Sequence, residues 1–403
     1  MFPNDCVTGG KLANRYFICV CIVAFTYHFG LNASNSTFTI YLRHLGYEPS
    51  LNGIIAIPAS LTAMAFRIVS AHTTDNIGRR FTIILGLAIY GICIFMTGAI
   101  PVIGVIIVFR ILQAAGFSTV NTGSSAANID VAPPDKVGLG SAIFFLMVTL
   151  SMLIVGLIMS YFVDRGAFST LYALAAGIII ASIAAAAMMN YEKKPEYQKL
   201  RAEERQLAPP LRGINKFFFR EALPIAAVST LQSLGFSCAA TYLPLFGKEM
   251  GIPGYGQFFI VSAFVAIISN LSASKIIGRG RPLPVLLPCY AASALGFLWL
   301  TLAPSAASYF AMAAAYGTMF GFCTPVLYGE AMRLAPATRR GAASGTLMLA
   351  TDIGMGLGNA IWGIMITAAG FSAAFAGAAA FYIAAAIFGL FIFKAKGVVK
   401  HAN

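Results

Sequence analysis

The chain has 403 residues, of which 59% are hydrophobic and only 10% are charged, and its mean hydropathy is +0.80. A soluble globular protein carries about a quarter of its residues as charged side chains, so this composition excludes a soluble protein and indicates an integral membrane protein. Lysine and arginine outnumber aspartate and glutamate by 27 to 14, which gives a net charge of +13.

Twelve apolar runs are long enough to cross a bilayer, whose hydrocarbon core of roughly 30 Å needs about 20 helical residues. We place them at residues 16–40, 51–70, 81–99, 102–128, 138–163, 168–190, 221–246, 256–276, 283–302, 306–330, 341–367 and 371–393. The sequence therefore predicts an all-α integral membrane protein with twelve transmembrane helices.

The first run follows two basic residues and has the charge pattern of a signal peptide. Its apolar stretch is long, however, and Asn32 and Asn35 stand where a signal would be cleaved. We expect a transmembrane helix, in which His28, Asn32 and Asn35 share one face that lines a cavity. An unperturbed histidine side chain titrates near neutral pH, which makes His28 a possible proton site, and a hydrogen-bonded packing histidine remains the other interpretation.

The turn between the second and third helices reads TDNIGRR, residues 74–80. Gly78 permits a tight turn, and Arg79 and Arg80 fit the excess of basic residues on the cytoplasmic side. These roles leave Asp75 unexplained, because an acid weakens that excess.

In the fourth helix, Arg110 lies well inside the membrane, where a charge costs at least about 2.5–3.5 kcal/mol, so it must face the bundle interior. It begins a stripe of residues spaced by three or four positions, which places them on one helix face. The stripe consists of Arg110, Gln113, Phe117, Asn121, Ser124 and Asn128.

The longest polar interruption, residues 191–220, is rich in mixed charge and proline, as linkers are. Loops on either side of it repeat at an offset of about 203 residues: residues 131–142 match residues 334–345. We therefore expect two six-helix bundles related by pseudo-symmetry, as parallel repeats in transporters are. The predicted boundaries are 1–190 for the first bundle, 191–220 for a cytoplasmic linker and 221–403 for the second bundle.

In the second half, Asp352 lies near the middle of the eleventh helix and is the only acid so placed. A buried acid can take up a proton on one side of the membrane and release it on the other, or bind a cationic substrate. Asn359 lies two turns further along the same face. Asp130 and Glu330, at helix ends, are of the kind that more often serves gates or interfaces.

The basic residues orient the chain. With the amino terminus in the cytoplasm, 23 lysines and arginines fall on the cytoplasmic side and three on the opposite side. This asymmetry predicts that both termini are cytoplasmic and removes the need to explain the net charge by nucleic-acid binding.

Two motifs resemble those of the major facilitator superfamily. Residues 71–80, AHTTDNIGRR, resemble the family pattern G-x-x-x-D-x-x-G-R-R/K and depart from it at Ala71. Residues 110–116, RILQAAG, resemble the R-x-x-Q-G-x-G pattern of proton-coupled members and depart from it at Ala114. The resemblance covers the whole chain and implies the family fold, with a closer likeness to drug:proton antiporters and related efflux carriers.

The resemblance also implies residue roles. Asp75, Gly78, Arg79 and Arg80 would form a gating motif, in which Asp75 meets the start of the eleventh helix near Arg340 when the cytoplasmic side closes. Arg110 would act in a proton relay or in substrate binding, beside Asp352 and His28 as proton-coupling candidates. Helices one, four, seven and ten surround the substrate cavity in the family. The cavity candidates are Asn32, Asn35, Gln113, Phe117, Asn121, Gln232, Tyr316 and Asn359.

Motifs for an ATPase P-loop, a zinc hydrolase or a nucleophile elbow are absent from the sequence, and its cysteines form no metal-binding pattern. We therefore expect no enzyme, cofactor or metal, but a monomeric secondary transporter in the cell membrane that moves a small organic solute. Proton-coupled efflux by alternating access is the preferred function. The alternatives are proton-coupled uptake of a sugar, carboxylate or peptide-like solute and, from another class, a membrane-embedded enzyme or receptor.

Overall fold

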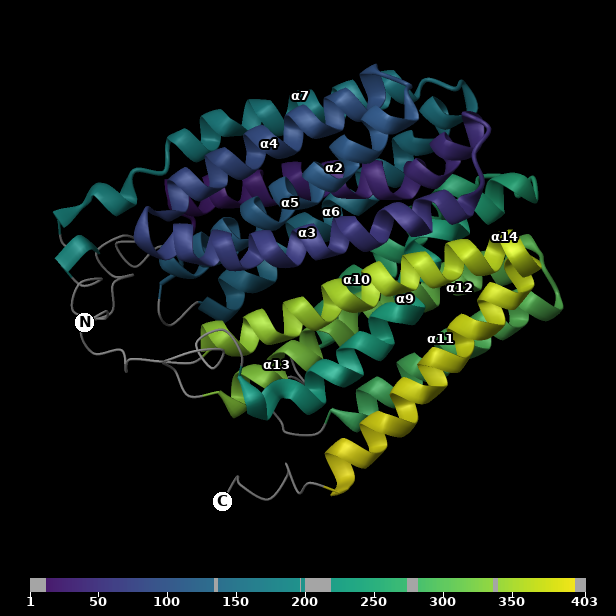
Figure 1. The fold of residues 1–403 in the computed structure, drawn as a ribbon. Helices are drawn as coiled ribbons and strands as arrows, with labels where there is room; N and C mark the ends of the chain where they lie inside the picture. Colours follow the sequence, from purple (N-terminus) through teal and green to yellow (C-terminus); the bar gives the residue numbers. More distant parts are fainter. Residues whose placement is uncertain are drawn as a thin grey trace. The chain divides into compact units, whose positions relative to one another are not determined.

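The computed structural model describes residues 12–133, 137–195, 197–199, 219–273, 282–335 and 340–395. Most of these residues are helical, and no strand occurs within these ranges (Figure 1). Helices follow from the apolar runs because a backbone in lipid must satisfy its N–H and C=O groups within the segment. Large apolar side chains remain exposed on the outer faces, such as Phe264 at 64% and Phe391 at 67%. The predicted all-α class is confirmed.

Among the described residues, ten helices are long and apolar enough, by length and composition, to cross a membrane. One of them, Gly345–Phe393, has 49 residues and contains most of the two last predicted spans. It lies in α14 (Arg340–Ala395), whose backbone leaves helical geometry at Gly370 with a φ of 81°. A shorter apolar helix covers Tyr255–Asn270. The chain is thus a multi-pass membrane protein, and the count of twelve stays a prediction.

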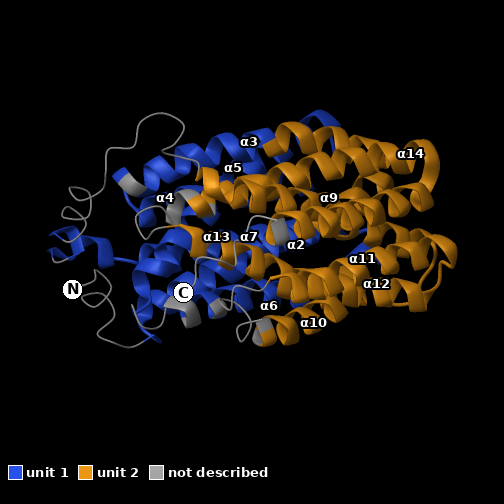
Figure 2. Ribbon diagram, turned by 90° about the horizontal axis from the view of Figure 1, so that it is seen from below, with its two compact units in different colours: residues 1–34, 61–155, 162–210 blue, residues 35–60, 156–161, 211–403 orange. Residues whose placement is uncertain are grey.

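The chain divides into two compact units (Figure 2). Their boundaries run through three helices, α2 (Arg15–His44), α3 (Pro49–Asn76) and α6 (Val137–Asp164). One segment of each of these helices is therefore counted with the second unit. Unit 1 comprises residues 1–34, 61–155 and 162–210, and unit 2 comprises residues 35–60, 156–161 and 211–403.

In unit 1, α4 (Arg79–Ala99) packs against both α5 (Ile103–Val131) and α7 (Phe168–Ala187). A Cβ atom at Gly116 of α5 would lie 2.6 Å from the backbone nitrogen of Tyr90 in α4. A Cβ atom at Gly98 of α4 would lie 2.6 Å from the Cβ of Tyr172 in α7. Glycine is required at both points because any side chain there would force the helices apart.

The principal helices of unit 2 are α9, α10, α11, α12, α13 and α14. The predicted span 306–330 is interrupted: α12 (Ala306–Thr318) passes into a five-residue π-helix, η6 (Met319–Cys323), before α13 (Thr324–Leu334). Short π segments inside α-helices occur frequently at functional sites. The others are α9 (Leu223–Glu249), α10 (Phe258–Ala273) and α11 (Leu283–Leu302).

Close packing of α9 on α14 forms the core of unit 2. A Cβ at Gly354 would lie 2.6 Å from the carbonyl oxygen of Thr230, and the indole Nε1 of Trp362 donates to the carbonyl of Leu234 at 2.7 Å. The first turns of α3 also contact α14, since a Cβ at Gly53 would lie 2.9 Å from Ala360 Cα. This contact explains why residues 35–60 are counted with unit 2.

Candidate functional site

Three polar side chains, of which Ser34 and Gln113 are buried and Arg110 is half-buried, form a network between α2 and α5. The Arg110 Nη1 donates to the hydroxyl of Ser34 at 2.5 Å and to the Gln113 Oε1 at 3.1 Å. The Gln113 Nε2 donates to the same hydroxyl at 3.0 Å. We call Ser34, Arg110 and Gln113 the Arg110 network. It shows that the stripe predicted on the fourth helix turns its charged end toward the first helix, inside unit 1.

The next turns of the stripe meet aromatic and polar groups of α2. The Tyr27 hydroxyl donates to Asn121 Oδ1 at 3.4 Å and accepts from Ser124 at 3.2 Å. Phe117 lies edge-on to both Tyr27 and His28, with ring centroids 5.7 and 5.9 Å apart. The stripe therefore continues along the face of α5 that packs on α2.

His28 is half-buried, and its Nδ1 lies 3.1 Å from the carbonyl oxygen of Ala24. A carbonyl only accepts hydrogen bonds, so this contact requires the proton on Nδ1 and leaves Nε2 as the nitrogen that could take up another. The ring also lies 4.2 Å from the ring centroid of Tyr27. This geometry fits the packing interpretation of His28 and leaves a proton role to Nε2 alone.

The asparagines of α2 have separate environments. The Asn32 Nδ2 donates to the Ser151 hydroxyl of α6 at 3.0 Å, which joins two helices of unit 1. Asn35 lies three residues further along α2, among the residues counted with unit 2, and is half-buried. The predicted shared face of α2 thus crosses the boundary between the units.

In unit 2, Gln232 of α9 is 4% exposed and holds two partners. Its Oε1 accepts from the Tyr290 hydroxyl of α11 at 3.0 Å, and its Nε2 donates to Thr324, the first residue of α13, at 3.4 Å. One turn along α9, the Phe236 ring stacks on Tyr316 at 4.4 Å. Gln232 and Tyr316 therefore belong to one polar and aromatic cluster around the π-helix.

The two candidates on α14 differ. Asn359 is engaged by α9: its Oδ1 accepts from Thr241 at 2.8 Å, and its backbone carbonyl accepts from the Tyr242 hydroxyl at 2.7 Å. Asp352, two turns earlier, is half-buried, and the neighbouring Thr351 lies 3.2 Å from Ser229 of α9, hydroxyl to hydroxyl. Asn359 thus has a clear packing role, whereas Asp352 keeps its predicted position inside the helix.

The turn that contains the predicted gating motif is shorter than the sequence predicted. Helix α3 continues to Asn76 and α4 begins at Arg79, so that only Ile77 and Gly78 connect them. Gly78 has a φ of 136°, a conformation that favours glycine. The backbone of Asp75 is helical, but its side chain and that of Arg340 lie outside the described part of the structure. Their predicted approach therefore stays a prediction.

Arg79 is buried at 5% exposure and joins the turn to the end of α5. Its Nε donates to Asp130 Oδ2 at 2.8 Å, and its Nη1 donates to the carbonyl of Thr74 at 2.7 Å. Tyr197 donates its hydroxyl to the same Asp130 oxygen at 2.6 Å, and the Tyr191 hydroxyl lies 3.5 Å from it. We call Arg79, Asp130, Tyr191 and Tyr197 the Asp130 cluster. Burial, together with the Asp130 carboxylate, raises the pKa of the Tyr197 hydroxyl well above its ordinary value and keeps it a donor.

Glu192 supplies a second link that the sequence analysis missed. Its two carboxylate oxygens accept from the backbone N–H groups of Arg79 at 2.7 Å and Arg80 at 3.0 Å. The Arg80 guanidinium also donates to the Asn190 side chain at 2.5 Å. A signal was present in the sequence: Gly78 precedes α4 and has no side chain to cap it, so the first amides of α4 needed an acceptor from elsewhere.

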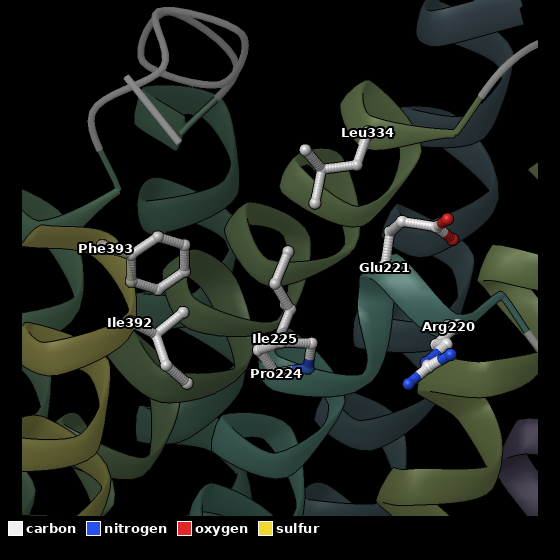
Figure 3. Close-up of a pocket in the computed structure, with 7 residues that line it drawn as sticks. All are labelled: Arg220, Glu221, Pro224, Ile225, Leu334, Ile392 and Phe393. Atoms are coloured by element: carbon white, nitrogen blue, oxygen red, sulfur yellow. The ribbon is translucent and has the colours of Figure 1, made fainter. Parts of the chain in front are cut away.

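Two grooves contain none of the predicted site residues. One, of about 450 Å³, lies where α9 begins: Ile225, Leu334, Ile392 and Phe393 face a common space with Arg220 and Glu221 at one side (Figure 3). The other, of about 490 Å³, lies in unit 1 between α2 and α6. Its lining is entirely apolar and consists of Ala13, Phe17, Ile18, Cys21, Ile22, Phe25, Ile143, Met147, Leu150 and Ile154. Among the described residues, no group of three histidine, cysteine or acidic side chains could hold a metal ion.

Comparison with known proteins decides the family. The model of the Major Facilitator Superfamily matches residues 20–359, which is most of the chain. The chain belongs to the Major Facilitator Superfamily. Members of this superfamily are transporters of small molecules and not enzymes, so this protein is a transporter. The family fold expected from the two motifs is thereby confirmed, whereas the efflux subgroup is not tested.

Curated relatives add the family name alone. Uncharacterized MFS-type transporters of Pseudomonas aeruginosa, among them those of strains LESB58 and UCBPP-PA14, are 31% identical over 147 residues. The match spans 36% of this chain and 36% of each relative, about a third of its length.

Solved structures share the superfamily fold over nearly the whole chain. A POT family transporter in complex with 5-aminolevulinic acid has a TM-score of 0.75 at 14% identity and covers 97% of this chain and 99% of its own. A D-xylose-proton symporter has a TM-score of 0.74 at 13% identity, with coverages of 95% and 98%. The nucleoside transporter NupG has a TM-score of 0.70 at 14% identity, with coverages of 94% and 99%. At these identities the likeness shows the fold alone.

Proposed function

We propose that this superfamily member exports a small organic solute in exchange for protons by alternating access. The observation that carries the proposal is the Arg110 network. A guanidinium inside a membrane helix is expensive to bury, and here Ser34 and Gln113 hold it with neutral hydrogen bonds. A cation held in this way can attract an anionic or polar group of a solute, or repel an incoming proton.

The fixed geometry of α5 supports the same proposal. Gly116, the last residue of the RILQAAG motif, lets α5 approach the Tyr90 backbone of α4. This close approach sets the rotation of α5 and so directs Arg110 and Gln113 toward α2. Of the motif residues, Gly116 therefore packs against α4, whereas Arg110 and Gln113 present polar groups toward α2.

The apolar groove between α2 and α6 supports an organic solute with an apolar part. Phe25 and Met147 line it, and His28 and Ser151 follow them by three and four residues, on the same helix faces. The polar end of such a solute would then lie near the bond between Asn32 and Ser151.

For the proton we assign Asp352 as the carrier and His28 as the second candidate. Asp352 is an acid inside the bundle of helices, and His28 keeps one ring nitrogen for a proton. Protonation of either from one side and release to the other would couple the solute to the proton gradient. The Asp75 latch against the start of α14 would then control which side is open.

The test is reconstitution of the protein in liposomes with an imposed pH gradient. A panel of organic anions, sugars, nucleosides and small peptides is supplied, and a trapped pH-sensitive dye reports the proton flux. Exchange of the solute against protons supports export, and movement of both in the same direction supports the alternative of proton-coupled uptake. Asp352→Asn should abolish coupling while Asp164→Asn, at the exposed end of α6, should not. Coupled transport that survives in Asp352→Asn would move the proton role to another group.

The proposed orientation in the membrane is inferred from the distribution of basic residues along the chain. We propose that the protein resides in the cell membrane as a monomer with both termini in the cytoplasm. A reporter fused to the carboxyl terminus that fluoresces only in the cytoplasm should therefore be active. If the cytoplasmic reporter gave no fluorescence and a reporter active only outside the cytoplasm gave a signal, the carboxyl terminus would lie outside and the proposed orientation would be wrong.

A further inference from the structure

The residues that follow α7 pack against unit 1, although the sequence analysis counted them as linker. We call residues 191–195 and 197–199 the anchor segment. Tyr191 is 0% exposed and Tyr197 is 4% exposed. Their rings lie edge to face at 5.3 Å, and Tyr191 also meets Tyr16 of α2 at 5.6 Å. A flexible linker would not bury two aromatic side chains at its first residues.

Glu192 of the anchor segment holds the start of α4. A helix leaves its first backbone N–H groups without partners, and an acid there also gains from the positive end of the helix dipole. Both carboxylate oxygens of Glu192 are used in this way, on Arg79 and Arg80. A Cβ at Gly78 would lie 3.0 Å from Glu192 Oε2, so the glycine also makes room for the carboxylate.

Tyr197 holds the end of α5. Its hydroxyl and the Nε of Arg79 donate to the same oxygen of Asp130, at 2.6 and 2.8 Å. Tyr191 reaches that oxygen only at 3.5 Å, where a hydrogen bond is weak. The anchor segment therefore fixes α4 through Glu192 and α5 through Tyr197, and it ties both to the gating motif by way of Arg79.

We propose that Glu192 and Tyr197 are positioning residues of the transport cycle. The anchor segment contacts both the start of α4 and the end of α5. Any displacement of the anchor segment would therefore be carried to the short turn between α3 and α4 and to the end of α5. The inference rests on the proposed transport function, because it assigns these two residues to the conformational step and not to solute binding.

The variants are Glu192→Gln, which removes the charge and one acceptor oxygen, and Tyr197→Phe, which removes one hydroxyl. Two matched controls are available. Tyr191→Phe removes a hydroxyl from the same aromatic pair at the longer distance, and Glu221→Gln neutralises an exposed acid just before α9. Glu192→Asp keeps the charge on a shorter side chain and should restore part of the function.

The first measurement is backbone amide exchange in lipid nanodiscs. Loss of a charge-assisted hydrogen bond should speed exchange in the first turn of α4 by about tenfold in Glu192→Gln. The second measurement is proton-coupled flux of whichever panel solute gives the largest signal. We expect the maximal rate to fall about tenfold in Glu192→Gln and Tyr197→Phe with the half-saturating concentration unchanged, and neither control to change.

The outcomes separate the two proposals. Faster amide exchange with an unchanged maximal rate would make the anchor segment a purely structural support and overturn the inference. A rise in the half-saturating concentration alone would also overturn it, because the residues would then act on binding. Wild-type protein that moves no solute under any gradient would overturn the proposed function first, and the positioning role with it.

Discussion

Arg79→Gln removes the cation at the centre of the Asp130 cluster. The Arg79 side chain is 7% exposed and lies 2.8 Å from an Asp130 carboxylate that is 17% exposed. Removal of one partner from a buried ion pair costs about 3–5 kcal/mol, because the other charge is left without a counterion. Tyr197 still donates to that carboxylate, so we expect the lower end of the range, about 3 kcal/mol.

Thermal unfolding can be followed with a thiol-reactive dye, since five cysteines are buried and would react only on unfolding: Cys19, Cys93, Cys238, Cys289 and Cys323. The entropy of unfolding grows with chain length, so for 403 residues a loss of about 3 kcal/mol should lower the melting temperature by on the order of 4 °C. The double variant Arg79→Gln/Asp130→Asn leaves no unpaired charge and should recover part of this loss.

Arg80→Gln is the control for this prediction. The Arg80 guanidinium is bonded to the Asn190 side chain at an exposed position, and its loss should cost about 1 kcal/mol or less. The reasoning fails if Arg79→Gln melts at the wild-type temperature, or if Arg80→Gln is destabilised by as much as Arg79→Gln.

Three glycine substitutions follow from the same packing, all measured by this unfolding assay. Gly78→Ala should destabilise by about 1–3 kcal/mol, more than Gly46→Ala: both have positive φ, but only at Gly78 does the new methyl meet the carboxylate that caps α4. Gly116→Ala should lower stability by about 1–3 kcal/mol by overpacking against the Tyr90 backbone. Gly104→Ala on the same helix has open space and should be neutral or stabilising by up to about 1 kcal/mol. Equal effects at the two positions of α5 would show that the close helix approach does not determine the outcome.

The sequence could predict the helices and the polar stripe because both are local properties. An apolar run of fixed length forms a helix in lipid regardless of its neighbours, and the spacing of Arg110 and Gln113 places them on one face of any α-helix. Their common partner could not be named in advance. Ser34 is one of several small polar residues on α2, and only the helix packing selects it.

Longer-range partners were not predictable from local patterns. Glu192 lies 113 positions from Arg79 in the sequence. A charged residue that follows an apolar run is typical of a linker, so its sequence context gave no indication of this contact. Asn359 likewise has partners that its pattern did not indicate: its polarity and its spacing from Asp352 predicted a cavity position, and in the structure its two oxygens accept hydrogen bonds from α9. A polar side chain in a membrane helix can hydrogen-bond to a neighbouring helix as readily as to a solute. The spacing of polar residues along the helix does not distinguish the two roles.

The π-helix at η6 changes the register of the helix that contains it. Tyr316 and Thr324 are eight residues apart, which in an unbroken α-helix of 3.6 residues per turn would rotate them about 80° from each other. A π turn takes up one additional residue, so the pair is spaced as if by seven residues and both face α9, where they meet Phe236 and Gln232. The helix therefore contains one residue more than its length requires. Deletion of a single residue between Met319 and Cys323 would convert the segment to plain α-helix and keep this face intact, whereas an insertion there would turn Thr324 away from Gln232.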